Sequence, residues 1–359
     1  MNVPVPAKIG FLRSGGWWVI AAVALSGVAF AYYALQIVTS QRSRAIGDGH
    51  DVTSYRFALE PCLVPRDLLV ASGMVKDGLP ALVDPTAWTL AQAEAASAAR
   101  SKFLVPADRV IGVVAGGEAR AYPLRLLVWH EVANDTLGGV PIAVTYSALC
   151  DSAVVFRRST GSRTPTFGVS GLLYDSDLVI YDRQPGGAGE SLWSQLLFKA
   201  IAGPAAASAA TLEVLPMSVE AWGDWRREHP ETTILALDPR MAQQYSRDPY
   251  ASYFGSERLH FPVRPLPSPA LFPLKTPVVA LGGPAGWTAF PFKALANGGP
   301  ASALKGSART LAAALTYRPG VPTVAVDPVK LPAGTGVVYA SYFAWYATHH
   351  ADTTWAGTP

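Results

Sequence analysis

The sequence predicts an α+β protein with a mixed, β-rich core and short helices, preceded by one N-terminal transmembrane helix. Half of its 359 residues are hydrophobic and only 15% are charged, a composition that excludes a disordered chain and can fill a sizeable core. Short apolar runs alternate with turns that contain glycine or proline, and helical spacing extends over only a few short segments. Two pairs of similar segments, described below, further predict an internal duplication of a small α+β unit.

The transmembrane helix is expected at residues 17–38, after a short tail at 1–16. This segment is almost wholly apolar and carries no charge. About 20 such residues cross the hydrocarbon core of a bilayer, whereas the apolar region of a signal peptide usually spans about 7–15. We therefore predict an uncleaved single-pass anchor in the inner membrane, with the bulk of the chain on the periplasmic or extracellular side. The alternative is a helix buried in the globular part.

Charge and cysteine content narrow the functional classes. The formal net charge is +3 and the basic residues are scattered, which gives no indication of nucleic-acid binding. The two cysteines, Cys62 and Cys150, leave three possibilities open: one disulfide, a reactive thiol, or two inert buried thiols.

After a polar tether at 39–60, a first α+β unit is expected at 61–260. Its apolar periodicity and turn residues predict the following elements. They are a helix at 87–99, a hairpin at 109–122, a helix at 124–133, an Asn134–Asp135–Thr136 turn, strands at 140–146 and 153–157 around a turn at 147–151, a hairpin at 166–183 turning at Asp175–Ser176, a helix at 219–229 capped by Ser218, and a strand at 232–237.

A proline-rich segment at 261–276 is interpreted as a semi-rigid linker to a second, shorter unit at 277–359. Residues 277–294 repeat the pattern of 109–126: an apolar run, a Gly-rich turn, then alanine, an aromatic residue and proline. A second pattern of tryptophan, histidine and threonine is also repeated, as Trp225–His229–Thr232 and Trp345–His349–Thr353. The two similarities occur in the same order, as a duplication requires.

The candidate site lies in the first unit, because the second has no counterpart of His130 or Cys150. Cys150 ends an apolar run, and His130 precedes it by twenty residues across a Gly-Gly break and one strand, so we expect the two side chains to meet. A thiolate needs such a neighbour, a helix N-terminus or a metal to stabilise it. Weaker candidates for the site are Ser147, Glu131, Asp135 and Asp177.

Three kinds of chemistry remain open at this point. Cys150 could cycle through a sulfenic acid or a mixed disulfide. Cys150 and His130 could ligate a soft metal such as copper or zinc, with further ligands from Cys62, His229 or a carboxylate. Cys150, His130 and an orienting Asp135 could catalyse acyl transfer. The non-functional alternative is a buried Cys150 that only fills the core.

Five motifs resemble the domain of unknown function 3179 family: DGLPAL (77–82), the long segment 110–156, TFGVSGLLYDSDLVIYDR (166–183), SLWSQLLFKAIAGP (191–204) and YSRDPYASY (245–253). The resemblance implies an exported or membrane-anchored bacterial or archaeal protein whose activity is not settled. Members carry Cys-Pro-Leu-Cys-Gly-Thr-Ala where this chain has SALCDSA (147–153), and selenoprotein relatives imply redox or soft-metal chemistry there.

This chain departs from that motif, since Ser147 replaces the first cysteine. A dithiol cycle then needs Cys62 as a partner, or the chain is a one-thiol variant, or the activity has been lost. The sequence therefore favours thiol-based redox or copper-type metal handling at Cys150 and His130, with an unidentified protein or small molecule as redox partner. That hypothesis expects a solvent-reachable Cys150 with a depressed pKa. The alternative is a non-catalytic anchored scaffold or binding protein with a degenerate site.

Overall fold

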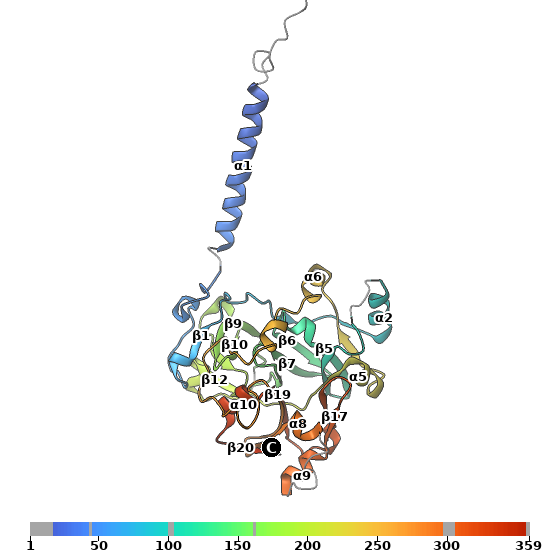
Figure 1. Ribbon diagram of the computed structural model, residues 1–359. Coiled ribbons are helices and arrows are strands. Elements are labelled where there is room, and N and C mark those ends of the chain that lie inside the picture. The colour runs from blue at the N-terminus through green and yellow to red at the C-terminus, as the bar shows by residue number, and fades with distance from the viewer. Residues whose placement is uncertain (1–16, 43–44, 100–103, 161–162, 297–305, 357–359) are drawn as a thin grey trace, which may run out of the picture. The chain divides into compact units, whose positions relative to one another are not determined.

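A computed structural model describes residues 17–42, 45–99, 104–160, 163–296 and 306–356. The chain divides into two compact units, Met1–Ile46 and Gly47–Pro359. The described part of the first unit is one helix, α1 (Trp17–Arg42), drawn in blue in Figure 1. Its segment Trp17–Leu35 has a mean hydropathy of 1.9 and is not buried in the described structure, which argues against a core helix. A signal sequence would share these properties.

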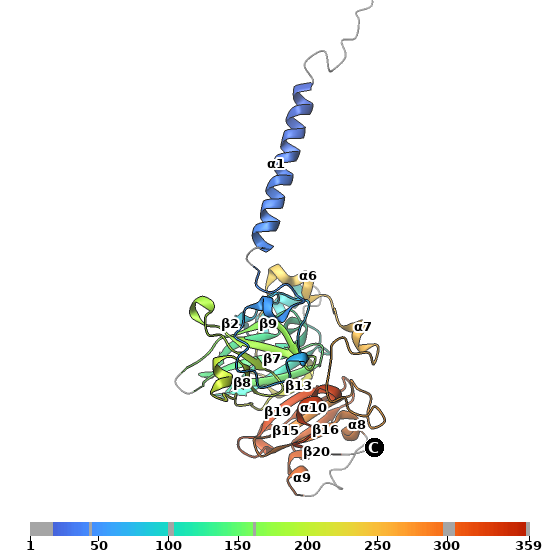
Figure 2. The same cartoon turned by 90° about the vertical axis from the view of Figure 1, so that its left-hand side faces the viewer.

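Three β-sheets form the second unit, Gly47–Pro359. The largest sheet has eight strands in the spatial order β2 (Leu82–Val83), β6 (Val132–Leu137), β7 (Val140–Ser147), β8 (Ser152–Arg157), β19 (Gly336–Ser341), β15 (Pro277–Gly283), β16 (Gly286–Pro291) and β20 (Thr353–Trp355). Figure 2 shows the later strands of this sheet, in orange and red, gathered on one side of the earlier ones. Strands from both sides of the 261–276 segment thus share one sheet, and the division of the chain there stays a prediction.

The other two sheets are smaller. The seven-stranded sheet has the order β17 (Leu315–Arg318), β18 (Thr323–Val326), β13 (Ser218–Ala221), β4 (Arg109–Ala115), β5 (Glu118–Pro123), β14 (Thr233–Leu235) and β3 (Ala87–Trp88). The five-stranded sheet has the order β1 (Leu69–Ala71), β9 (Phe167–Tyr174), β10 (Asp177–Asp182), β11 (Leu192–Ser194) and β12 (Lys199–Ala202).

Short helices connect these strands. They are α2 (Leu90–Ala99), α3 (Leu124–Leu127), α4 (Pro204–Ala207), α5 (Trp222–Glu228), α6 (Ala242–Tyr245), α7 (Ala251–Phe254), α8 (Phe292–Ala296), α9 (Gly306–Ala312) and α10 (Tyr342–His349). The predicted α+β class with a sheet-rich core is therefore confirmed, as is the apolar N-terminal helix.

The side chains of β7 show that the eight-stranded sheet lies between the other two. Ile142 and Val144 belong to an apolar core shared with the seven-stranded sheet, whereas Ala143 belongs to a second core shared with the five-stranded sheet. Successive residues of a strand point to opposite faces, so this alternation places one neighbouring sheet on each face. Cys150 belongs to the second core.

The two similar stretches of sequence form the same motif twice. In the first copy β13 pairs antiparallel with β4, β4 pairs antiparallel with β5, and β14 returns parallel to β5 after α5. In the second copy β19, β15, β16 and β20 repeat these pairings around α10. Each copy also pairs with a hairpin that lies within the other copy in the sequence. The β7–β8 hairpin of the first copy pairs through β8 with β19 of the second, and the β17–β18 hairpin of the second copy pairs through β18 with β13 of the first.

Two of the predicted hairpins are confirmed, and the reason is local. At the turn between β9 and β10, Asp175 and Ser176 have φ angles of 50° and 65°. The turn between β4 and β5 uses Gly116 and Gly117, at 55° and 82°. Two successive positive φ values match the right-handed twist of the paired strands, and glycine adopts them without strain while aspartate tolerates them.

The predicted helix at 124–133 and the predicted turn at Asn134–Asp135–Thr136 are wrong beyond the first helical turn. α3 ends at Leu127, Glu131 adopts a positive φ of 55°, and β6 begins at Val132. Residues 132–137 pair with β7 across a Gly138–Gly139 turn, so tertiary pairing overrides the helical spacing. The helix at 219–229 likewise starts only at Trp222, because Ser218 does not cap it but lies in β13.

Candidate functional site: a buried carboxyl–thiol site

The site lies where two turns meet between the eight-stranded and five-stranded sheets. One turn links β7 to β8 and carries Cys150, and the other is Asp175–Ser176. The thiol of Cys150 donates a hydrogen bond to the carbonyl oxygen of Ser176 over 3.3 Å. This bond places Cys150 beside Asp177, the first residue of β10.

The environment of Cys150 favours the neutral thiol. The residue is fully buried, and burial raises the pKa of the thiol well above its usual range. The neighbouring Asp177 raises this pKa further, and a contact with Ser147 opposes the shift. The expectation of a solvent-reachable Cys150 with a depressed pKa is therefore the reverse of what the structure has.

A chain of side-chain hydrogen bonds runs from Thr145 through Gln195 and Ser152 to Asp177. The Thr145 hydroxyl donates to the carbonyl of Val154 over 2.8 Å, so it can only accept from Nε2 of Gln195, at 2.9 Å. The Ser152 carbonyl, 3.5 Å from the same Nε2, favours this orientation of the amide, because the amide oxygen would be repelled there.

The end of this chain bears on the protonation state of Asp177. The amide oxygen Oε1 of Gln195 accepts from the Ser152 hydroxyl over 2.6 Å, which uses the only proton of that hydroxyl. Oδ1 of Asp177 also lies 2.9 Å from the Ser152 Oγ. The same hydroxyl can instead donate to Oδ1 of Asp177, and when it donates to Gln195 a proton on Asp177 fills this contact. The arrangement thus accommodates a protonated Asp177 when Ser152 donates to Gln195.

The surroundings of Asp177 agree with this assignment. The residue is 1% exposed, and burial raises its pKa to about 7. Hydrogen bonds from the Ser152 hydroxyl and from the backbone N–H of Leu196, 3.1 Å from Oδ2, only partly oppose the shift. A carboxyl with a pKa near 7 exchanges its proton close to neutral pH.

A second carboxyl, that of Glu131, lies near enough to Asp177 for the two charges to interact. Desolvation raises the pKa of Glu131 to about 8, and the nearby charge of Asp177 adds to the shift. The residue is partly exposed, and its carboxyl makes no hydrogen bond to any other part of the chain that the structure describes. Glu131 thus leaves its oxygens available to a ligand or to water.

His130 does not join the thiol. Its Nδ1 lies 2.7 Å from the carbonyl oxygen of Pro80 and must donate to it, so Nε2 accepts from the hydroxyl of Tyr245 over 2.6 Å. Burial lowers the pKa of His130, which matches this neutral form of the ring. Both ring nitrogens are therefore engaged, and His130 holds the segment before β2 against α6. The expected meeting of His130 with Cys150 is not found.

Asp135 likewise binds other side chains of the fold and not Cys150 or His130. Its carboxylate forms a buried ion pair with Nη1 of Arg120 at 2.7 Å and accepts a hydrogen bond from the Tyr122 hydroxyl at 2.7 Å. These partners lie in β5, so the pair joins the seven-stranded sheet to the eight-stranded one. Since His130 is bound elsewhere, Asp135 does not orient it as acyl transfer would require.

Of the candidate residues, the structure thus brings together Glu131, Ser147, Cys150 and Asp177. Ser152 and Gln195 also belong to the site, although no sequence pattern had indicated a role for them. The spacing offered one usable signal, since Ser152 follows Cys150 by two residues and begins β8, and Gln195 ends the SLWSQ motif.

Both cysteines are free thiols. Cys62 is partly exposed, forms an isolated bridge with Ala202, and donates from its thiol to the carbonyl of Val64 over 3.3 Å. Among the residues that the structure describes, no group of three or more His, Cys, Asp or Glu side chains is placed to hold a metal.

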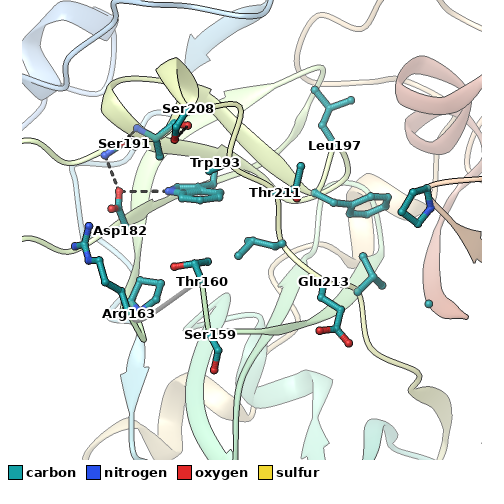
Figure 3. Close-up of a pocket in the computed structure, with 18 of the residues that line it drawn as sticks. Ser159, Thr160, Arg163, Asp182, Ser191, Trp193, Leu197, Ser208, Thr211 and Glu213 are labelled. Atoms are coloured by element: carbon teal, nitrogen blue, oxygen red, sulfur yellow. Dashed lines mark hydrogen bonds between the residues drawn. The ribbon is translucent and has the colours of Figure 1, made fainter. Parts of the chain in front are cut away.

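Two hollows adjoin the site. A cavity of about 620 Å³ borders the Cys150 turn at Tyr146, Ala148 and Asp151, and Tyr250 and Arg247 line it as well. A larger cleft of about 1140 Å³ lies on the other side of the loop 194–198, with Leu197 and Phe198 in its wall (Figure 3). The loop 194–198 therefore separates the cleft from the buried site. Gln195 and Leu196 of this loop form hydrogen bonds with Ser152 and Asp177 of the site, whereas Leu197 and Phe198 line the cleft.

The fold and the site together define a β-rich α+β protein with a buried carboxyl–thiol site and one apolar N-terminal helix. Residues 76–326 match the family model described as Protein of unknown function (DUF3179), and the chain belongs to this family. All the site residues lie within the matched segment. Searches of curated proteins and of solved structures gave no match.

Proposed function

We propose that this DUF3179 protein carries out acid–base chemistry on a small polar molecule at the carboxyl–thiol site. Asp177 is the proton donor, and the observation that supports this role is its buried contact with the Ser152 hydroxyl, where a proton on Asp177 fills the contact when Ser152 donates to Gln195. An acid or base catalyst is most effective when its pKa lies near the working pH, and burial raises the pKa of Asp177 to about 7.

Glu131 is the second proton-exchanging group in this proposal. Its pKa, raised to about 8, and its partly exposed position suit a carboxyl that passes protons between the buried acid and the outside. Because the charges of the two carboxyls interact, they titrate as a pair. The substrate would enter from the 620 Å³ cavity beside the Cys150 turn.

The two more specific functions that the sequence favours are thiol redox and copper-type metal handling. Both have weaker support in the structure than acid–base chemistry has. Thiol–disulfide exchange proceeds through the thiolate, and the raised pKa of Cys150 opposes its formation. Metal ligation by His130 would require breaking its bond to Pro80 or to Tyr245. We propose that Cys150 instead excludes water and orders the Asp175–Ser176 turn.

We also propose that α1 is a membrane anchor that holds residues 47–359 on the extracytoplasmic side. The length and hydropathy of Trp17–Leu35 support an anchor. The orientation rests on the tendency of long segments to be translocated largely regardless of their charge.

Infrared spectroscopy of the full chain in detergent tests the proton on Asp177. The carbonyl stretch of a protonated carboxyl should be present at pH about 6 and disappear as the pH rises through about 7, and the Asp177→Asn variant should lack it. Asp182→Asn is the matched control, because that carboxylate at the other end of β10 meets only donors: Ser191 N, Trp193 Nε1 and Gln184 Nε2.

A second carboxyl signal, from Glu131, should remain in Asp177→Asn and titrate at lower pH than in the wild type, since the neighbouring charge has been removed. If no protonated carboxyl is lost in Asp177→Asn, the acid–base proposal is wrong. The non-catalytic anchored scaffold would then be the better description.

A further inference from the structure

The 1140 Å³ cleft is a separate feature from the carboxyl–thiol site, and its walls differ in chemistry. We propose that it binds a neutral, polyhydroxylated ligand of more than one ring, such as a short oligosaccharide. This inference does not depend on the acid–base function, because the cleft shares only the loop 194–198 with the buried site.

One wall presents a fixed row of polar groups. The amide of Gln184 donates to Oδ2 of Asp182 over 2.6 Å, and Nη2 of Arg163 donates to the amide oxygen of Gln184 over 2.8 Å. Oδ1 of Asp182 accepts from Ser191 N at 2.6 Å and from the Trp193 indole at 3.3 Å, as the dashed lines in Figure 3 show. Carboxylate, amide and guanidinium are thus held side by side by bonds to one another.

Another part of the lining is apolar. Phe198 and Trp287 lie with ring centroids 5.2 Å apart, and Leu212 and Val214 continue this surface. Phe198 and Trp287 are mostly buried and held by a cluster that includes His349, so their exposed edges have fixed positions. A sugar ring has the same two-sided character, with C–H groups on its faces and hydroxyls at its edge.

The polar groups of the cleft favour hydroxyls over ions. A hydroxyl both donates and accepts, and therefore matches a row in which acceptors and donors alternate. Two carboxylates of the cleft already have partners: Glu213 pairs with Nε of Arg157 at 2.7 Å, and Asp352 lies 3.1 Å from Nδ1 of His349. An ionic ligand would have to displace these contacts.

The size of the cleft argues for a ligand of several rings. Pockets for drug-sized molecules usually measure about 300–1,000 Å³, and this cleft exceeds that range. The hydroxyls of Ser159 and Thr211, both exposed at the cleft, make no side-chain hydrogen bond within the described ranges and can serve additional ligand groups.

Titration of the full chain in detergent with cellotriose, maltotriose and chitotriose tests the proposal, with tryptophan fluorescence and calorimetry as readouts. We expect saturable binding of at least one trisaccharide. The variant Thr211→Trp fills the cleft from an exposed position and should weaken this binding at least tenfold. Thr316→Trp, the same change at an exposed position of β17 outside the cleft, is the matched control and should leave the affinity unchanged.

Ser159→Trp provides a second blocking variant should Thr211→Trp alter the circular dichroism spectrum. The proposal is overturned if no trisaccharide binds, or if the cleft variants and Thr316→Trp have equal affinities. It is also overturned if only benzyltrimethylammonium binds, because an organic cation attracted to aromatic rings would then be the fitting ligand.

Discussion

Asp177 and Asp182 begin and end the same strand, β10, and differ in the hydrogen-bond partners of their Oδ1 atoms. Asp182 accepts from two N–H donors of the neighbouring chain segment and from the Gln184 amide, whereas Oδ1 of Asp177 competes with Gln195 for the single proton of the Ser152 hydroxyl. Two aspartates five residues apart in one element thus have different chemistry, which the partners of each side chain decide.

The raised pKa of Asp177 predicts a stability that falls as the pH rises. Between pH about 4 and about 7 the folded chain holds a proton on Asp177 that the unfolded chain has lost, so increasing pH favours unfolding. Relative to Asp177→Asn, we expect the wild type to lose on the order of 4 kcal/mol of unfolding free energy from pH about 4 to about 8. Urea unfolding in detergent at a series of pH values measures this difference.

Asparagine is a suitable replacement because its amide can donate to the Ser152 Oγ as the protonated carboxyl does, while its oxygen still accepts from Leu196. The control is Glu231→Gln, a change at an exposed side chain, which should follow the wild-type pH profile. Parallel profiles for the wild type and Asp177→Asn would contradict the prediction.

The buried position of Cys150 predicts slow reaction with thiol reagents. In the folded chain only Cys62 should react, and the variant Cys62→Ser should react with a disulfide reagent only after unfolding in urea. Counting reacted thiols by mass spectrometry provides the measurement. Rapid labelling of Cys150 in folded Cys62→Ser would restore the redox hypothesis.

Replacing Asp135 is predicted to lower the free energy of unfolding and to leave the protonation of Asp177 unchanged. Asp135→Asn leaves the guanidinium of Arg120, whose side chain is 14% exposed, without its charge partner, and breaking a buried pair costs about 3 kcal/mol or more. Asp224→Asn breaks the exposed pair with Arg227 and should cost less than about 1 kcal/mol. Equal losses for the two variants, measured by urea unfolding, would rule out this role for Asp135.

Gly112 is predicted to tolerate no side chain. A Cβ there would lie 2.2 Å from the ring of Trp225, so Gly112→Ala should destabilise the fold by about 3 kcal/mol. Gly320→Ala is the control, because no atom lies within 4 Å of the added methyl group. The equivalent of Gly112 in the second motif is Ala280, which shows that the repeat itself does not demand glycine. Similar melting temperatures for both variants would contradict the assigned packing.

Retention of α1 in the mature chain is predicted if the helix is an anchor. The intact mass of protein from the membrane fraction should include residues 17–42, and alkaline washing should not release it. A mature chain that begins after residue 42 would instead identify α1 as a cleaved signal sequence.

The fold was predictable from the sequence where local chemistry decides. Gly116–Gly117 adopts a turn conformation that few other residues adopt, and Asp175 is of a type that tolerates it, so both hairpins could be located correctly. The repeated motifs were visible because the tryptophans of both copies make the same bond: Trp225 donates to Thr232 at 2.9 Å and Trp345 to Thr353 at 3.0 Å. The prediction of a helix at 124–133 was wrong because residues 132–137 pair with β7, and this pairing outweighs the helical spacing of the apolar residues.

The site could be predicted only in part. Cys150 was identified from its place at the end of a strand, but its neighbours come from elements that spacing does not connect. Asp177 reaches it because two sheets pack face to face, and Gln195 because β11 lies beside β10. His130 was assigned to the thiol on proximity in sequence, whereas its partners, Pro80 and Tyr245, lie 50 and 115 residues away.

The exchange of hairpins between the two motifs has a consequence for symmetry. β8 completes the sheet of the second copy at β19, and β18 completes the sheet of the first copy at β13. Each copy therefore gives its partner the same element that it receives, which is the defining property of an isologous contact between identical subunits. The described strands of the two motifs are therefore related to each other as the two subunits of a two-fold homodimer are.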